Sequence, residues 1–259
     1  NHEKREHSFS IGVLGLDATV EGPFSENYKG SYLVNFRYSS LDLLDKTGVI
    51  DFDGVPKYYD GSFKLNLPTA SAGNFVAFGL LGRSSIKQES GTSDENGENE
   101  VITEKTNFNA GMSVFGLKHF YNLNKRAYIK SYVSISNAFN GADERSFDSV
   151  PSVFKQVYKD NINENHLRVS TSYNEKFNAK STLNVGVIYT QSYFDMKAVA
   201  TKFSGVSETF ISDKGNGGIV QGYGSWKYRI KENVTLVSGI HYTQLLFNNK
   251  NSIEPRAGL

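Results

Sequence analysis

Tyr32-Leu33-Val34-Asn35-Phe36-Arg37-Tyr38-Ser39 is the stretch that decides the fold, because large apolar side chains alternate in it with polar ones. In an extended chain, successive side chains point to opposite faces of a sheet. The side chains that would therefore share one face are Tyr32, Val34, Phe36 and Tyr38, with Asn35, Arg37 and Ser39 on the other. The stretch predicts a β-strand with one apolar face and one polar face.

The same alternation recurs along the whole chain and predicts roughly eleven strands. Many of these runs reach about ten residues, which is close to the length of a strand that crosses a bilayer at a tilt and longer than an ordinary strand. The predicted strands fall within residues 14–20, 32–38, 63–67, 75–82, 108–114, 129–135, 167–173, 183–189, 220–228 and 234–242, and a last one begins near Ile253.

The connections between these runs are alternately tight and long. An antiparallel meander with minimal turns at one end and long loops at the other is the plan of an up-and-down outer-membrane barrel. The sequence therefore predicts an all-β, transmembrane, antiparallel barrel, with residues 1–259 forming part of one barrel domain. Tight turns are expected at 21–28, 68–73, 121–125, 174–180 and 231–232, and long loops at 41–59, 87–106, 139–165 and 195–217.

Composition agrees with this prediction but does not decide it. Hydrophobic residues make up 38% of the 259 residues, aromatic residues make up 13%, and the mean hydropathy is −0.42. Many Tyr, Phe and Gly residues with few aliphatic ones suit strands that expose one face to lipid and the other to a wet lumen. A soluble β-sandwich rich in aromatic residues would have a similar composition.

Several classes of function are disfavoured by what the sequence contains. Positive and negative charges are interspersed and the net charge is +1, so no basic stripe indicates a nucleic-acid partner. Cysteine is absent, which excludes disulfides and thiol chemistry. The five histidines lack metal-ligand spacing, and no apolar run of about 18 residues predicts a transmembrane helix. We expect no enzyme activity, no cofactor and no metal site.

Two sets of residues are the candidates for ligand contact. The first set consists of cations on the predicted wet face, which would line a lumen and guide an anionic substrate or pair with neighbouring acids. The second set consists of aromatic side chains in the predicted long loops, which would stack on a ligand or pack the loops together. The lumen-facing candidates are Arg37, Lys64, Arg83, Lys130, Arg168 and Lys227, and the loop candidates are Phe52, Tyr58, Tyr59, Phe139, Phe147 and Phe203.

Two acidic runs, at residues 51–54 and 94–100, have oxygen ligands of the kind that bind calcium. Their spacing does not match a defined calcium loop. We interpret both as solvated outer loops.

Five stretches of the chain resemble strands of TonB-dependent outer-membrane receptors, in particular the Bacteroidota type with a carboxypeptidase-regulatory-like domain ahead of its plug. Among them are Val20-Glu21-Gly22-Pro23-Phe24 and Phe63-Lys64-Leu65-Asn66-Leu67-Pro68. The resemblance spans essentially the whole chain and is densest before about Phe78 and at the C-terminus. Its stretches are residues 15–17, 20–24, 30–39, 63–68 and 252–256.

The resemblance implies a plugged barrel of about 22 strands that imports a scarce nutrient with energy from an inner-membrane complex. The plug, the segment that contacts TonB and the signal peptide are not found in the sequence, so we expect the chain to be a fragment of such a barrel. Implied partners are outer-membrane lipids, the TonB complex through the plug, a nutrient ligand and, in some receptors, a surface lipoprotein. The alternatives are a small self-contained outer-membrane channel or assembly protein, and a soluble β-rich adhesin or carbohydrate-binding module.

Overall fold

The computed structural model describes residues 3–12, 15–39, 41, 47–48, 54, 56–93, 100–148, 153–202 and 204–259. Twelve β-strands account for most of these residues. They are β1 (Glu6–Gly12), β2 (Gly15–Ser25), β3 (Tyr28–Tyr38), β4 (Lys57–Pro68), β5 (Asn74–Ser93), β6 (Glu100–Asn122), β7 (Ala127–Asp148), β8 (Val153–Lys176), β9 (Ser181–Thr201), β10 (Ser207–Lys231), β11 (Val234–Leu245) and β12 (Asn251–Gly258).

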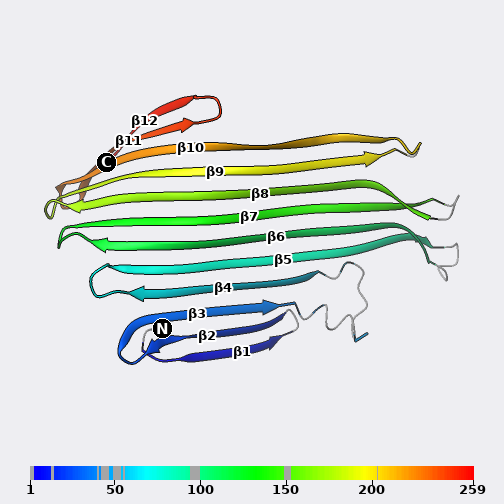
Figure 1. The fold of residues 1–259 in the computed structure, drawn as a ribbon, viewed down its shortest axis with the longest axis horizontal. Coiled ribbons are helices and arrows are strands. Elements are labelled where there is room, and N and C mark those ends of the chain that lie inside the picture. The colour runs from blue at the N-terminus through cyan, green and yellow to red at the C-terminus, as the bar shows by residue number, and fades with distance from the viewer. Residues whose placement is uncertain are drawn as a thin grey trace.

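The strands form a single antiparallel sheet in which spatial order equals chain order, from β1 to β12 (Figure 1). This up-and-down meander confirms the predicted fold class. The count of about eleven omitted β1, which is the short edge strand. The sheet is open, because β1 pairs only with β2 and β12 only with β11 within the described chain. The closure that a small self-contained barrel requires is therefore not formed by these residues.

The tight turns lie at one end of the sheet, as predicted. Connections of two to five residues follow β2, β4, β6, β8 and β10. Two of them are built alike: the side-chain oxygen of Asn124 accepts hydrogen bonds from the backbone N–H groups of Arg126 and Ala127, and Asn178 does the same for Lys180 and Ser181. Asparagine favours turns because its side chain can replace a backbone acceptor in this way.

The prediction of long loops is wrong for most of the residues concerned. Strands β5 to β10 continue through them and reach 20 to 25 residues. The polar composition at 87–106, 139–165 and 195–217 predicts loops, but these residues pair in the sheet. The extensions of β6 to β9 have partners on both sides, whereas those of β5 and β10 pair only with β6 and β9, respectively. The ladder contains bulges at Ser90/Gly91, Glu144/Arg145 and Thr209/Ile211.

Glycine fixes the turn between β4 and β5. Gly73 has φ 83°, a left-handed conformation that other residues rarely adopt. Its carbonyl oxygen accepts hydrogen bonds from the backbone N–H and the hydroxyl of Thr69, at 2.8 and 2.7 Å. A β-carbon at this position would collide with the carbonyl oxygen of Phe120 in β6. The turn therefore needs glycine both for its backbone angle and for its contact with the neighbouring hairpin.

The sheet has almost no hydrophobic core. Among the described residues, only Ala127 and Ala198 are buried apolar side chains. The accessible surface is 17390 Å², whereas a compact folded protein of this mass exposes only about 11,000 Å². The described strands form one layer with no second sheet packed on it, so the sandwich expected for a soluble adhesin is not formed. No helix in the described segments is long and apolar enough to cross a bilayer.

Candidate functional site

Strand register sorts the side chains onto two faces of different chemistry. Residues that are opposite one another across neighbouring strands share a face. One face, here called the apolar face, carries the partners Val34, Phe63, Gly79, Phe115, Ile135 and Leu167 in successive strands. The other, the polar face, carries their chain neighbours Asn35, Ser62, Leu80, Val114, Ser136 and His166.

Side chains on the apolar face stay exposed although they are hydrophobic. Phe36 is 50% exposed, Ile135 57% and Ile240 54%. A protein in water rarely leaves a continuous surface of this kind uncovered. The face is therefore built to contact an apolar environment.

Aromatic residues border the apolar face at both ends, here called the aromatic borders. Near the tight turns, the rings of Phe75 and His119 stack at 4.4 Å, and Trp226 lies 5.5 Å from Tyr228. The opposite border contains Tyr38, Tyr59 and Tyr193. In β9 the apolar band runs over residues 183–193, which is the length of about 9–11 residues that a tilted strand needs to cross a bilayer.

Trp226, the single tryptophan of this sequence, provides a test of lipid contact. Its side chain is 44% exposed on the apolar face, and its indole N–H donates to the hydroxyl of Ser181 at 2.8 Å. In vesicles of brominated phosphatidylcholine, we expect the lipid to quench the fluorescence of Trp226. The Trp226→Phe variant lacks this indole and gives the emission of the protein without it. In the Trp226→Phe background, a Tyr223→Trp substitution moves the indole to the polar face and should escape quenching. Equal quenching at both positions would contradict the assignment of the faces.

A hydrogen-bonded network occupies the polar face of β2, β3 and β4. The guanidinium of Arg37 forms an ion pair with Asp60 at 2.8 Å and lies 5.4 Å from the ring centre of Tyr58. The amide of Asn35 donates to Asp17 at 3.1 Å and to Thr19 at 2.8 Å. Because the Arg37 side chain is 53% exposed, the ion pair contributes at most about 1 kcal/mol to stability. It orients groups rather than holding the sheet together.

A hollow lies beside this network. Gly82 in β5 leaves space where a side chain would otherwise stand, and the space is lined by Arg37, Tyr58, Asp60 and Met112. It presents a cation, a carboxylate, a phenol and a thioether to a molecule that enters from the polar face. This combination can bind a small polar ligand with an apolar part.

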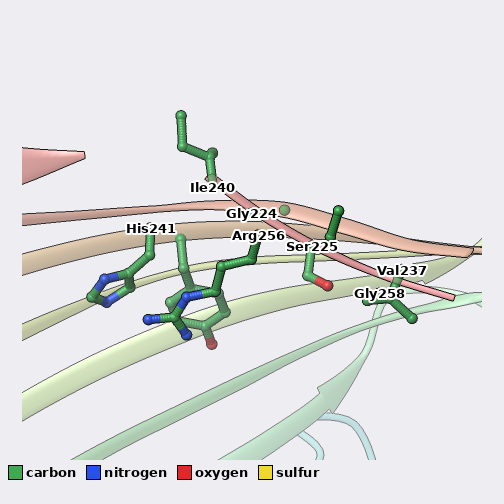
Figure 2. A pocket seen from close by; sticks show the side chains of 10 residues that line it. Gly224, Ser225, Val237, Ile240, His241, Arg256 and Gly258 are labelled. Atoms are coloured by element: carbon green, nitrogen blue, oxygen red, sulfur yellow. The ribbon is translucent and has the colours of Figure 1, made fainter. Parts of the chain in front are cut away.

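A second hollow lies at the other side of the sheet, on β10, β11 and β12, where Gly239 and Gly258 leave space. Figure 2 shows His241 and Arg256 pointing to one side of the strands and Ile240 to the other. Arg256 forms an ion pair with Glu254 at 2.8 Å. The Nδ1 atom of His241 is 3.7 Å from the same carboxylate and has no hydrogen-bond partner in the described chain. The cluster can bind and orient a ligand, but it has no nucleophile with an activating base.

Five of the six predicted cations lie on the polar face, one strand after another. They are Arg37, Lys64, Lys130, Arg168 and Lys227. Sequence reasoning missed others on the same face, among them Lys118, Arg229 and Arg256. These could have been found by extending the alternation of each strand to its end. The role of the cations in ligand contact remains a prediction.

Arg83 does not share this face. Register pairs it with Tyr59 and Gly111 on the apolar face, where its guanidinium lies 5.6 Å from the ring centre of Phe139. Residues 75–82 are almost uniformly apolar, so the sequence contains no alternation there that shows which residues of the strand point to which face. Arg83 is located just beyond Leu81, at the aromatic border opposite the tight turns.

The predicted loop aromatics prove to be strand residues where the structure describes them. Tyr58 and Tyr59 lie in β4, on the polar and apolar faces respectively. Phe139 and Phe147 lie in β7, and both are on the apolar face. Phe52 and Phe203 lie outside the described residues. Tyr58 and Tyr59 both line the hollow at Gly82, and Tyr58 is the one whose side chain lies on the polar face.

Beyond the apolar band, the polar face changes its chemistry. In β8 the hydroxyl of Tyr158 donates to Asp160 at 3.3 Å, and the other oxygen of Asp160 accepts from the backbone N–H of Ala142. Partial burial and the nearby carboxylate raise the pKa of Tyr158 above its ordinary value. The phenol therefore keeps its proton, and remains a donor, to a higher pH than an ordinary tyrosine does.

No group of three metal-binding side chains occurs in the segments that the structure describes. The acidic run at 51–54 is described only at Gly54, and of the run at 94–100 only the backbone of Glu100 is described. Both calcium candidates therefore lie essentially outside the described residues.

Comparison with known proteins supports the fold. No protein-family model matches the chain, and no curated protein matches its sequence. Among solved structures, a mutant of the ferric enterobactin receptor PfeA from Pseudomonas aeruginosa is similar over 98% of this chain, with a TM-score of 0.53 and 12% identity. The copper transporter OprC is also similar over 98% of this chain, with a TM-score of 0.60 and 10% identity.

These two similar proteins are longer than the chain. It covers 40% of the PfeA structure and 41% of the OprC structure. At 10–12% identity the likeness establishes a shared fold, which is the antiparallel sheet of an outer-membrane β-barrel.

Proposed function

We propose that this chain is part of the barrel of an outer-membrane, TonB-dependent transporter that takes up a small-molecule nutrient. The observation that carries the proposal is the two-faced sheet: an exposed apolar band with aromatic borders on one side and a charged, hydrogen-bonded surface on the other. Such a sheet is stable when lipid covers the first side and water or protein covers the second. The likeness in fold to PfeA and OprC supports the same conclusion.

The mechanism is transport without bond chemistry. The polar face forms the lumen wall, and the hollows at Gly82 and at His241 offer binding surfaces along it. In a complete receptor, a plug would fill the lumen and contact the TonB complex. The finer features implied by the sequence resemblance, a Bacteroidota receptor with a carboxypeptidase-regulatory-like domain and a surface lipoprotein, remain predictions.

Uptake measurements test the proposal with two probes taken from the structural neighbours. Cells that produce the full-length protein are compared with a deletion strain for accumulation of radioactive iron from ferric enterobactin and of copper ions. We expect accumulation of one probe to depend on the protein and to stop when a protonophore removes the energy source. Uptake that persists with the protonophore would favour the passive channel. Accumulation of neither probe would remove both of these ligand classes from the proposal.

A further inference from the structure

Charge is sorted by face where β5 to β10 extend beyond the apolar band. On the apolar-face side of this extension, seven basic side chains lie among three carboxylates, Glu89, Asp143 and Asp195. The seven, here called the outer basic band, are Arg83, Lys87, Lys105, Arg145, Lys159, Lys197 and Lys214.

The opposite side of the same strands has the reverse charge. Its described charged side chains are six carboxylates and one lysine, Lys155. Solubility in water would require charge on both sides but would not separate its sign. The carboxylates are Glu104, Glu144, Asp160, Glu164, Glu208 and Asp213.

Four members of the outer basic band form no ion pair within the described chain: Arg83, Lys87, Lys159 and Lys197. In contrast, Lys105 is paired with Glu89 at 2.9 Å, Arg145 with Asp143 at 2.9 Å and Lys214 with Asp195 at 3.2 Å. Clustered cations without partners repel one another, so the arrangement is stabilised when anions lie among them.

The position of the band matches the headgroup layer of a bilayer. Arg83 comes two residues after Leu81, and Lys197 comes four residues after Tyr193 at the aromatic border. With a rise of about 3.3 Å per residue and a tilt of about 40°, the two cations lie roughly 5–10 Å above the apolar band. The ring of Phe139 beneath Arg83 keeps its guanidinium at the boundary of lipid and water.

A hollow is also present within the band. It lies on β8, β9 and β10, has a volume of about 410 Å³ and is lined by Lys159, Asn161, Lys197 and Thr201, together with Asp160 and Asp195. The carboxylate of Asp195 is paired with Lys214, and that of Asp160 accepts hydrogen bonds from Tyr158 and Ala142. Two ammonium groups beside an amide and a hydroxyl are donors that suit a phosphate. The hollow therefore offers a defined place for one headgroup.

We propose that the outer basic band binds the phosphorylated headgroups of glycolipids in the outer leaflet that surrounds the barrel. The inference rests on the proposed function, since it requires the apolar face to be in a membrane. Charge complementarity, the height of the band and the hollow at Lys159 and Lys197 all favour this occupant over solvent. The lipid would fix the barrel laterally and vertically in its leaflet.

The test uses the full-length protein in a neutral detergent, titrated with bisphosphorylated lipid A, with bound lipid counted by native mass spectrometry. The variant Arg83→Gln/Lys87→Gln/Lys159→Gln/Lys197→Gln should need at least tenfold more lipid A for equal occupancy, since each cation near an anionic surface contributes about fivefold. The matched control, Lys64→Gln/Lys118→Gln/Lys130→Gln/Lys227→Gln, removes the same charge from the polar face and should bind as wild type does.

Equal binding by the band variant and wild type would overturn the inference, as would an equal loss in the polar-face control. Competition by millimolar inorganic phosphate would also overturn it, because the site would then recognise free anions. Trp226 quenching in brominated vesicles separates the two proposals. If Trp226 is quenched but the band variant binds lipid A as wild type does, only the proposal on the outer basic band is refuted. If Trp226 is not quenched, the membrane assignment is refuted, and the proposal on the outer basic band with it.

Discussion

Substitution of Val133 by arginine is expected to destabilise the assembled barrel by about 2–4 kcal/mol, the cost of an arginine on a lipid-facing strand at the bilayer midplane. Val133 is 40% exposed on the apolar face of β7, between Ile129 and Phe139. Its register partner in β6 is Leu117 and in β8 Val169. The guanidinium would have to remain among acyl chains or distort the bilayer to reach water.

The matched control is Ser136→Arg, three residues further along the same strand. Ser136 is on the polar face opposite Val114 and His166, where an arginine can reach water. The measurement is urea unfolding of the full-length protein from phospholipid vesicles, together with the fraction that keeps its heat-modifiable migration in gels. A soluble protein would respond in the reverse way or equally to both substitutions, and either result would refute the lipid-facing assignment.

The second large effect is expected for Gly73→Val. Valine at φ 83° carries backbone strain of about 1–3 kcal/mol, and its β-carbon would collide with the carbonyl oxygen of Phe120. The β4–β5 turn would have to move away from β6, which breaks the pairing of Asn74 with Phe120 at the start of the ladder. We expect most of the full-length protein to fail assembly into the membrane fraction.

Ser71→Val provides the control for this turn, because Ser71 is exposed in the same connection and has no positive φ. Its assembled fraction should equal that of wild type, as measured by membrane fractionation and protease resistance. If Gly73→Val assembles normally, the contact between this turn and the neighbouring hairpin is not required for folding.

The sequence predicted the parts of the fold that depend on local alternation. Val34, Phe63 and Val187 were assigned to the oily side and lie there, because a buried or lipid-covered face fixes strand register strongly. The tight turns were also predicted, since residues such as Asn124 and Asn178 have a local chemical reason to turn the chain.

The errors have two physical origins. The extensions of β7 and β8 are polar on both sides, and polarity was interpreted as loop although long-range pairing satisfies the backbone. Arg83 was placed on the wrong face because the uniformly apolar residues before it contain no parity signal. Phe139 was assigned to a loop for the first of these reasons. The two hollows could not be predicted, because they form only where register brings a glycine beside side chains from other strands.

Every strand in this sheet is hydrogen-bonded only to the strands next to it in sequence. Each hairpin therefore pairs only with the hairpin before it and the hairpin after it. Contacts of this local kind form early and cost little chain entropy. Growth can then proceed by zippering, one hairpin onto the last. Duplication or loss of a hairpin would change the circumference of the barrel and leave the pairing of the other strands unchanged. The width of the pore can therefore change in evolution by whole hairpins.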